Sequence, residues 1–383
     1  MPDQDVSIAR HFAGLPDPRV ARTRKHALAD ILVIALAATV AGADSFEGVA
    51  AFGRAKRAWL GRFLTLANGI PSADTFGRVF ARLDPQAFGK CVGEWMAAAC
   101  QAAGLRHIAI DGKSCRSAPR DTFSGCLHLV SAWAAEGRLI LGQQAVADGS
   151  HEIATIPALL RVLSLNGAVV TMDAAGCQKE IARQVRDQGG DYLLAVKGNQ
   201  PALHNAVRAV FGRACESDFV GVTHDGHEEV EDGHGRHEER YTTAIADPTG
   251  LPPGWPDVAA VVLVGREREV NGRRTDTAHY YVTSRRGTAA ELGGLIRRHW
   301  SIENELHWTL DVTFGEDANR TRADHAGANL GLVRRVAVSL LKQDPGKESM
   351  PTRRLRAALD ETYLEKVLRG FKANSMRRPW GRW

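Results

Sequence analysis

Apolar residues near the start of the chain recur at helical spacing. Residues 26–43 read HALADILVIALAATVAGA, and this apolar run predicts one buried helix. Further on, Ser72 begins SADTFGRVFARL at the position of a helix N-cap, and Phe76 and Phe80 share one face of that helix. The short helix resembles the recognition helix of a helix-turn-helix, although packing within a helical bundle explains its aromatic residues as well. We therefore predict a helical segment over residues 1–104.

At Gly104 the pattern changes to short apolar runs bounded by glycine and polar residues. Residues 105–200 read as three strands, a helix, a strand, a helix and a strand. The first strand, RHIAIDGK, contains Asp111, and the fourth, VVTM, ends at Asp173. The first three strands are expected to be antiparallel and the fourth to be a buried central strand. This order indicates an α/β fold.

Residues 201–288 interrupt that order with polar segments that predict strands. Turn residues at Gly233 and at Asn271-Gly272 indicate hairpins, so we interpret the segment as a β-rich insertion. Four histidines within it could suggest a metal site: His224, His227, His234 and His237. A solvated hairpin explains them better, because their spacing is not a clean tetrahedral set.

The stretch after the insertion carries an apolar stripe at helical spacing. Leu292, Ile296, Trp300, Leu306 and Leu310 recur at helical spacing, and Glu303 falls on the same stripe, three residues from both Trp300 and Leu306. A carboxylate that faces a core is costly unless a cation or hydrogen-bond donors meet it. The plain explanation is a buried ion pair with Arg297 or Arg298. Trp300 and Trp308, which flank Glu303, are expected to pack into the core.

The remaining sequence reads as a helix and a basic end. ANLGLVRRVAVSLLKQ predicts a second helix after Glu303, and residues 289–345 form one segment. Pro345, Gly346 and Pro351 indicate a linker to a basic tail over residues 346–383.

Composition and charge narrow the class of protein. A chain of 383 residues with 44% hydrophobic residues is expected to be globular, with two or three structural units. Its six cysteines form no CxxC pair, which favours a reduced, cytoplasmic protein with free thiols. The net charge is +5, and residues 352–383 hold nine Lys or Arg against three acids, which suggests a polyanion partner.

One membrane alternative arises near the start of the chain. RTRKH precedes the apolar residues 31–43 and imitates the charged and apolar regions of a signal peptide. The run is shorter than the roughly 20 residues that span a bilayer. A buried helix is therefore the favoured interpretation, and no membrane partner is expected.

Three carboxylates form the candidate chemical site: Asp111 and Asp173 on strands, and Glu303 on a helix. Such a set suits in-line displacement at phosphorus, in which two Mg²⁺ ions about 4 Å apart stabilise the attacking and leaving oxygens. Hard oxygen ligands favour Mg²⁺ and allow Mn²⁺ to replace it. Any one of these carboxylates alone would be a weak signal, whereas the order strand, strand, helix is moderately specific.

Several long motifs resemble the DDE insertion-sequence transposases, specifically the group of H-repeat-associated proteins. They are IDGKSCRSA, HEIATIPALL, VVTMDAAGCQKEIA, GGDYLLAVKGNQP, HGRHEER and HWSIENELHWTLDVTFGED. DILVIALAATVAGADSFEGVAAFG and IPSADTFGRVFARLDP resemble that group's N-terminal domain. The resemblance implies a ribonuclease-H-like core, a mixed sheet flanked by helices, which residues 105–200 begin and residues 289–345 complete. It also implies a β-rich insertion at residues 201–288 and a DNA-binding helical domain at residues 1–104.

The resemblance further implies a function and a set of partners. Asp111, Asp173 and Glu303 match the catalytic, metal-binding triad. The expected activity is Mg²⁺-dependent endonuclease cleavage of double-stranded DNA at element ends, after which the freed 3′-hydroxyl attacks target DNA. A homodimer is expected in the DNA complex. Two alternatives stay open, a metal-dependent nuclease of the same core that does not integrate DNA and a catalytically silent relic that still binds it.

The sequence departs from related transposases around the glutamate. Where those enzymes carry Tyr and Lys at set positions, this chain has Ile296 and Leu310, and His299 lies four residues before Glu303. The roles of those residues therefore do not transfer. Positive charge for DNA phosphates is expected instead from other side chains: Lys113, Lys197, Arg236, Arg240, Arg297, Arg298, His307, Arg320 and Arg322.

Overall fold

The computed structural model forms two compact units. It describes residues 11–12, 14–115, 127–147, 150–233, 236–270, 272–321 and 323–369. The first unit consists of Met1–Leu105, Gly112–His151 and Ile302–Trp383. The second unit consists of Arg106–Asp111 and Glu152–Ser301. Strand β1 (His107–Ser114) therefore begins in the second unit and ends in the first.

The first unit is mainly helical. Its early helices are η1 (Ala21–Thr23), α2 (Leu28–Val40), α3 (Phe46–Ala55), α4 (Arg57–Leu60), α5 (Ala73–Arg82) and α6 (Pro85–Ala103). Its later helices are a π-helix, η2 (Ile302–His307), then α11 (Trp308–Val312), η3 (Glu316–Ala318), α12 (Ala326–Lys342), α13 (Met350–Leu359) and α14 (Glu361–Leu368). The antiparallel strands β2 (His128–Ala134) and β3 (Leu139–Ala145) follow the end of β1.

Two apolar helices form the centre of the first unit. Nearly every residue of α2 is buried, and α12 is buried along most of its length and contacts α2, α5, α6 and β3. A helix that is apolar on all sides is stable only when other elements surround it. The predicted buried helix over residues 26–43 is thus confirmed. Within the described part of the chain, no helix combines the length and the apolar character that crossing a bilayer requires.

The second unit contains a sheet in which most strands are antiparallel. From the start of β1, the strand order is β4 (Val169–Met172), β5 (Asp191–Val196), β9 (Arg273–Thr283), β8 (Ala260–Val270), β7 (Arg236–Ala246) and β6 (His224–Gly233). β1, β4 and β5 are parallel, and β9 to β6 continue from β5 as antiparallel neighbours. Four helices accompany these strands: α7 (Glu152–Val162), α8 (Lys179–Asp187), α9 (Pro201–Glu216) and α10 (Ala289–His299).

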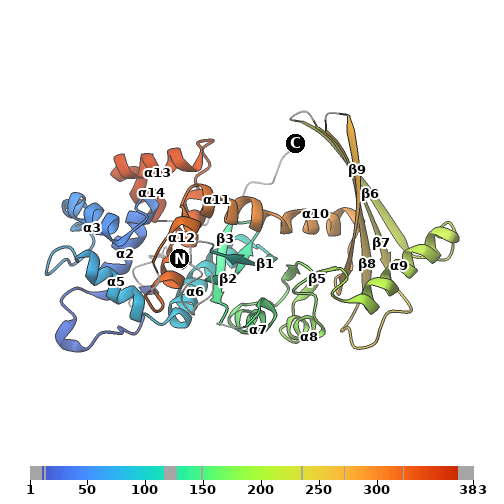
Figure 1. The fold of residues 1–383 in the computed structure, drawn as a ribbon, viewed down its shortest axis with the longest axis horizontal. Helices are drawn as coiled ribbons and strands as arrows, with labels where there is room; N and C mark the ends of the chain where they lie inside the picture. The colour runs from blue at the N-terminus through green and yellow to red at the C-terminus, as the bar shows by residue number, and fades with distance from the viewer. Residues whose placement is uncertain are drawn as a thin grey trace. The chain divides into compact units, whose positions relative to one another are not determined.

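Helices pack on both faces of the long strands in the second unit (Figure 1). Leu292 and Ile296 of α10 form a buried cluster with Val262 and Tyr281 on one face. The ring of Tyr280, the next residue along β9, contacts Phe211 of α9 at a centroid distance of 5.9 Å. Side chains alternate along a strand, so Tyr280 and Tyr281 serve opposite faces.

The element order predicted for residues 105–200 is confirmed, as β1, β2, β3, α7, β4, α8 and β5. The four strands of the insertion are present as predicted, but α9 precedes them and was not predicted. The first part of the basic end is helical, over Met350–Leu359 and Glu361–Leu368. Arg353 and Arg354 are buried there, and Arg354 donates to Asp44 at 2.9 Å. Residues 370–383 lie outside the described part of the chain.

Candidate active site

Two aspartates lie at one edge of the parallel strands in the second unit. Ile110 of β1 pairs with Met172 of β4, so Asp111 and Asp173 are the next residues on two adjacent strands. Neighbouring strands are about 4.8 Å apart, and residues in register on parallel strands point to the same side. Both side chains are half-buried. The strand pairing therefore places these two residues next to each other along the sheet.

The backbone after β4 holds the carboxylate of Asp173. Its Oδ1 accepts hydrogen bonds from the N–H groups of Ala175 at 2.9 Å and Gly176 at 3.3 Å. The loop after β5 supports the same turn, because Asn199 donates to the carbonyl of Ala174 at 2.6 Å. With Oδ1 bound in this way, Oδ2 remains the oxygen directed to other partners.

A buried hydrogen-bonded chain joins the two aspartate strands to α10. The Thr171 hydroxyl in β4 lies 2.9 Å from His107 Nε2 in β1 and 2.9 Å from His299 Nδ1 at the end of α10. One hydroxyl donates a single proton, so it donates to one ring and accepts from the other. Burial lowers the pKa of His107 to about 3 and that of His299 to about 4, although the Asp173 carboxylate opposes the second shift. Both rings are therefore neutral near pH 7.

The low pKa values of these two histidines lead us to expect a loss of stability in acid. Each histidine binds fewer protons in the folded protein than in the unfolded chain. The free energy of unfolding is therefore highest above the unfolded pKa of about 6.5, and it falls as the pH drops toward the folded pKa values near 3 and 4. The expected fall is about 1.4 kcal/mol per pH unit for each histidine between about pH 6 and 4. Urea unfolding at several pH values measures it, and His299→Gln should remove close to half of the slope from this pair. An identical slope in the variant would contradict this account.

Glu303 lies in the first unit, in the π-helix Ile302–His307, and its side chain is exposed. The prediction that it faces a core is wrong, and so is the buried ion pair that was its plain explanation. Trp300 and Trp308 are 43% and 58% exposed, so their predicted core packing is also wrong. The physical reason is that the regular α-helix ends at His299 and Ile302–His307 form a π-helix, so no single 3.6-residue stripe runs through residues 300–307.

A buried cluster of charges lies within the first unit. Lys113 Nζ is 2.6 Å from Asp311, 3.1 Å from Asp317 and 4.0 Å from Glu316. Burial disfavours the charged ammonium, but these carboxylates outweigh burial and raise the pKa of Lys113. Arg335 completes the cluster with a 2.7 Å pair to Glu316. Glu316 therefore pairs with both Lys113 and Arg335, and Asp317 pairs with Lys113.

Within the described ranges, no three His, Cys, Asp or Glu side chains group as a ready metal-binding set. The chemistry of the candidate donors still suits a hard cation, since Asp111, Asp173 and Glu303 offer only carboxylate oxygens. The four insertion histidines form no such set among their described members, and His234 lies outside the described residues. His237 instead lies 2.6 Å from Asp232 and 2.9 Å from Glu239, in agreement with the hairpin interpretation.

Comparison with known proteins identifies the family. Residues 102–338 match the model described as "Transposase DDE domain", and residues 9–96 match "DDE_Tnp_1-associated". The chain belongs to the DDE-domain transposases, a family of enzymes that act on DNA.

Two relatives that match this chain over nearly its whole length are named as putative transposases, and a third has no assigned function in its name. "Putative transposase YncI" of Escherichia coli O157:H7 is 35% identical over 97% of this chain and 98% of its own length. "H repeat-associated putative transposase YhhI" of Escherichia coli K12 is 33% identical over 95% of this chain and 98% of its own length. A protein of Xanthobacter autotrophicus, "Uncharacterized protein in dhlA 3'region", is 44% identical over 71% of this chain and 92% of its own length.

The candidate DNA-binding residues of this transposase occupy different environments. Lys197, Arg298 and Arg320 are exposed. Two others pair with acids of the insertion, Arg240 with the buried Glu238 and Arg297 with Glu229 and Glu231. Arg236 begins β7, and Arg322 lies outside the described residues.

Two of the candidates are poorly placed to bind phosphates. Lys113 is 7% exposed, and its ammonium is already bound by carboxylates. Burial lowers the pKa of His307 to about 3, so this ring brings no positive charge at neutral pH.

Sequence reasoning missed several residues that shape this site. Thr171, His107 and Asn199 drew no attention because their partners are remote in the sequence. The available signal was the position of Asn199 just after a buried strand, at the same edge of the sheet as Asp173. A polar amide at that position is well placed to cap the neighbouring turn.

Proposed function

We propose that this chain is an insertion-sequence transposase that cuts DNA at the element ends and joins the freed 3′-hydroxyl to target DNA. Membership of the DDE-domain family supports a DNA-acting enzyme. The observation that carries the site assignment is the pairing of Ile110 with Met172, which sets Asp111 and Asp173 side by side on parallel strands. Glu303 completes the proposed triad.

We infer a ribonuclease-H-like core for the part that holds the aspartates. The parallel strands β1, β4 and β5 and the antiparallel hairpin β2–β3 support it. In this proposal the helical domain covers residues 1–104, the core is formed by residues 105–200 and 289–345, and residues 201–288 are its insertion. The helical domain and the insertion would contact DNA outside the cut bond, and the basic end at 346–383 would add charge.

In this proposal Asp111, Asp173 and Glu303 hold divalent metal ions. When bound, two Mg²⁺ ions, or Mn²⁺ in their place, would activate the attacking oxygen and stabilise the leaving one. The contribution of the chain's other residues is to orient the carboxylates and the elements that carry them. The turn N–H groups of Ala175 and Gly176 fix the carboxylate of Asp173, and the Thr171 hydroxyl fixes the end of α10 against β1 and β4.

A strand-transfer assay tests the proposal. The substrate is a labelled duplex that carries the DNA flanking the gene, with a supercoiled plasmid as target and Mg²⁺ or Mn²⁺ as metal. We expect metal-dependent 3′-end nicking followed by joined products, formed by a homodimer that holds both ends. Nicking without joining would establish the nuclease alternative. DNA binding with neither product would establish the silent relic and overturn the proposal.

A further inference from the structure

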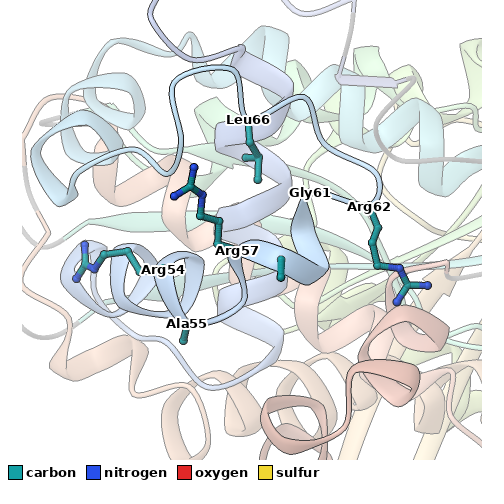
Figure 2. Close-up of a pocket in the computed structure, with 7 residues that line it drawn as sticks. Arg54, Ala55, Arg57, Gly61, Arg62 and Leu66 are labelled. Carbon is teal, nitrogen blue, oxygen red and sulfur yellow. The ribbon is translucent and has the colours of Figure 1, made fainter.

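A cavity of about 610 Å³ opens among the N-terminal helices of the first unit (Figure 2). It is lined by Arg54, Ala55, Arg57, Ala58, Gly61, Arg62 and Leu66. Apart from the three arginines, the lining side chains are small or apolar. A ligand that enters this cavity therefore meets guanidinium groups as its polar partners.

The packing of α3 and α4 explains why the arginines face outward. α3 buries Val49 and Ala50, and α4 buries Trp59 and Leu60. Arg54 at the end of α3 and Arg57 at the start of α4 are exposed. Residues 54–62 read RAKRAWLGR, with four cations and no acid.

Acidic residues of α14 pair with two of the four cations in this segment. Lys56 lies 3.1 Å from Glu361, and Arg62 lies 3.8 Å from Glu365 while its side chain stays 64% exposed. Among the described residues, no acidic side chain pairs with Arg54 or Arg57. Unneutralised guanidinium groups on an open surface attract a polyanion.

We propose that this cavity binds the phosphate backbone of duplex DNA, with Arg54, Arg57 and Arg62 each meeting a phosphate. The inference rests on the proposed function, because it assumes DNA as the substrate. The three guanidinium groups spread apart instead of converging on one point (Figure 2), which suits successive phosphates better than one small anion. A guanidinium group can donate two parallel hydrogen bonds to phosphate oxygens, and contacts of that kind position a protein on the duplex without reading its sequence.

Salt-dependent DNA binding by the full chain tests this site. Fluorescence anisotropy with a labelled duplex of arbitrary sequence gives the observed binding constant between about 50 and 200 mM salt. Each phosphate contact contributes about 0.9 to the slope of log binding constant against log salt, so Arg54→Gln/Arg57→Gln/Arg62→Gln should make the slope shallower by about 2 to 3. The matched control removes three charges from exposed positions outside the helical domain and the insertion, as Arg106→Gln/Arg161→Gln/Arg183→Gln. It should leave most of the slope intact.

The possible outcomes separate this site from the catalytic proposal. A variant whose slope equals that of the control, with both proteins folded by circular dichroism, overturns the cavity as a DNA contact. Loss of slope in a chain that never shows metal-dependent cleavage supports the cavity and overturns the proposed function. Competition by millimolar inorganic phosphate that abolishes duplex binding at constant ionic strength would identify a single-anion site and overturn the backbone contact.

Discussion

The substitution Asp173→Asn is expected to slow metal-dependent DNA cleavage by at least about 10³-fold, because metal stabilisation of the reacting oxygens is worth several kcal/mol and 1.36 kcal/mol is tenfold in rate. Asparagine keeps an oxygen that can accept from the N–H groups of Ala175 and Gly176, so the turn after β4 should persist. What the variant loses is the negative charge that a divalent cation requires. Single-turnover cleavage in Mg²⁺ and in Mn²⁺ measures the effect.

The matched control is Asp187→Asn, which removes the same charge from the exposed end of α8 in the same unit. It should cleave at the wild-type rate. Asp111→Asn should behave like Asp173→Asn, because the two residues occupy equivalent places on paired strands. The assignment of the triad is wrong if Asp111→Asn, Asp173→Asn and Glu303→Gln all cleave normally.

The sequence predicted the aspartate strands well for a simple physical reason. A buried strand needs a short apolar run, and VVTM before Asp173 and HIAI before Asp111 are such runs. Strand and helix order over residues 105–200 follows from the same alternation. The pairing of β1 with β4 depends on chain topology, which local pattern indicates only indirectly.

Glu303 shows where periodicity alone misleads. Its apparent place on an apolar stripe assumed a regular α-helix through residues 300–308, whereas Ile302–His307 form a π-helix. Inserted helical residues of this kind leave no clear sequence signature and often mark functional sites. The exposed Glu303 and Trp308 therefore could not be placed from the spacing of leucines.

The buried cations could not be predicted from the local sequence pattern either. The sequence around each of these cations does not show that it is buried. Burial is possible because a carboxylate remote in the sequence pairs with the cation, as happens for Lys113, Arg335 and Arg354. Charge counting assigned such residues to the surface or to a basic tail. The arginines of the cavity remained unassigned for the opposite reason, since only the tertiary packing of α3 and α4 shows that they share one opening.

The substitution Glu316→Gln is expected to lower the free energy of unfolding by about 3 to 5 kcal/mol, the usual cost of leaving a buried charge without its partner. Glu316 and Arg335 are 2% and 0% exposed and form a bidentate pair at 2.7 and 3.3 Å. Arg335 also donates to Ser131 Oγ in β2 at 3.1 Å, so the pair joins η3, α12 and β2 within the first unit. Glutamine preserves the shape but leaves the guanidinium uncompensated.

Urea unfolding followed by circular dichroism measures this effect, with Glu348→Gln as the control. Glu348 pairs with Arg356 at 3.3 Å on the surface, so its loss should cost no more than about 1 kcal/mol.

The double substitution Glu316→Leu/Arg335→Met removes both charges and should recover much of the lost stability, because apolar pairs of similar size often replace buried ion pairs without cost. Equal destabilisation by Glu316→Gln and Glu348→Gln would mean that water reaches Arg335, and the cluster would then hold β2 and α12 together by packing alone.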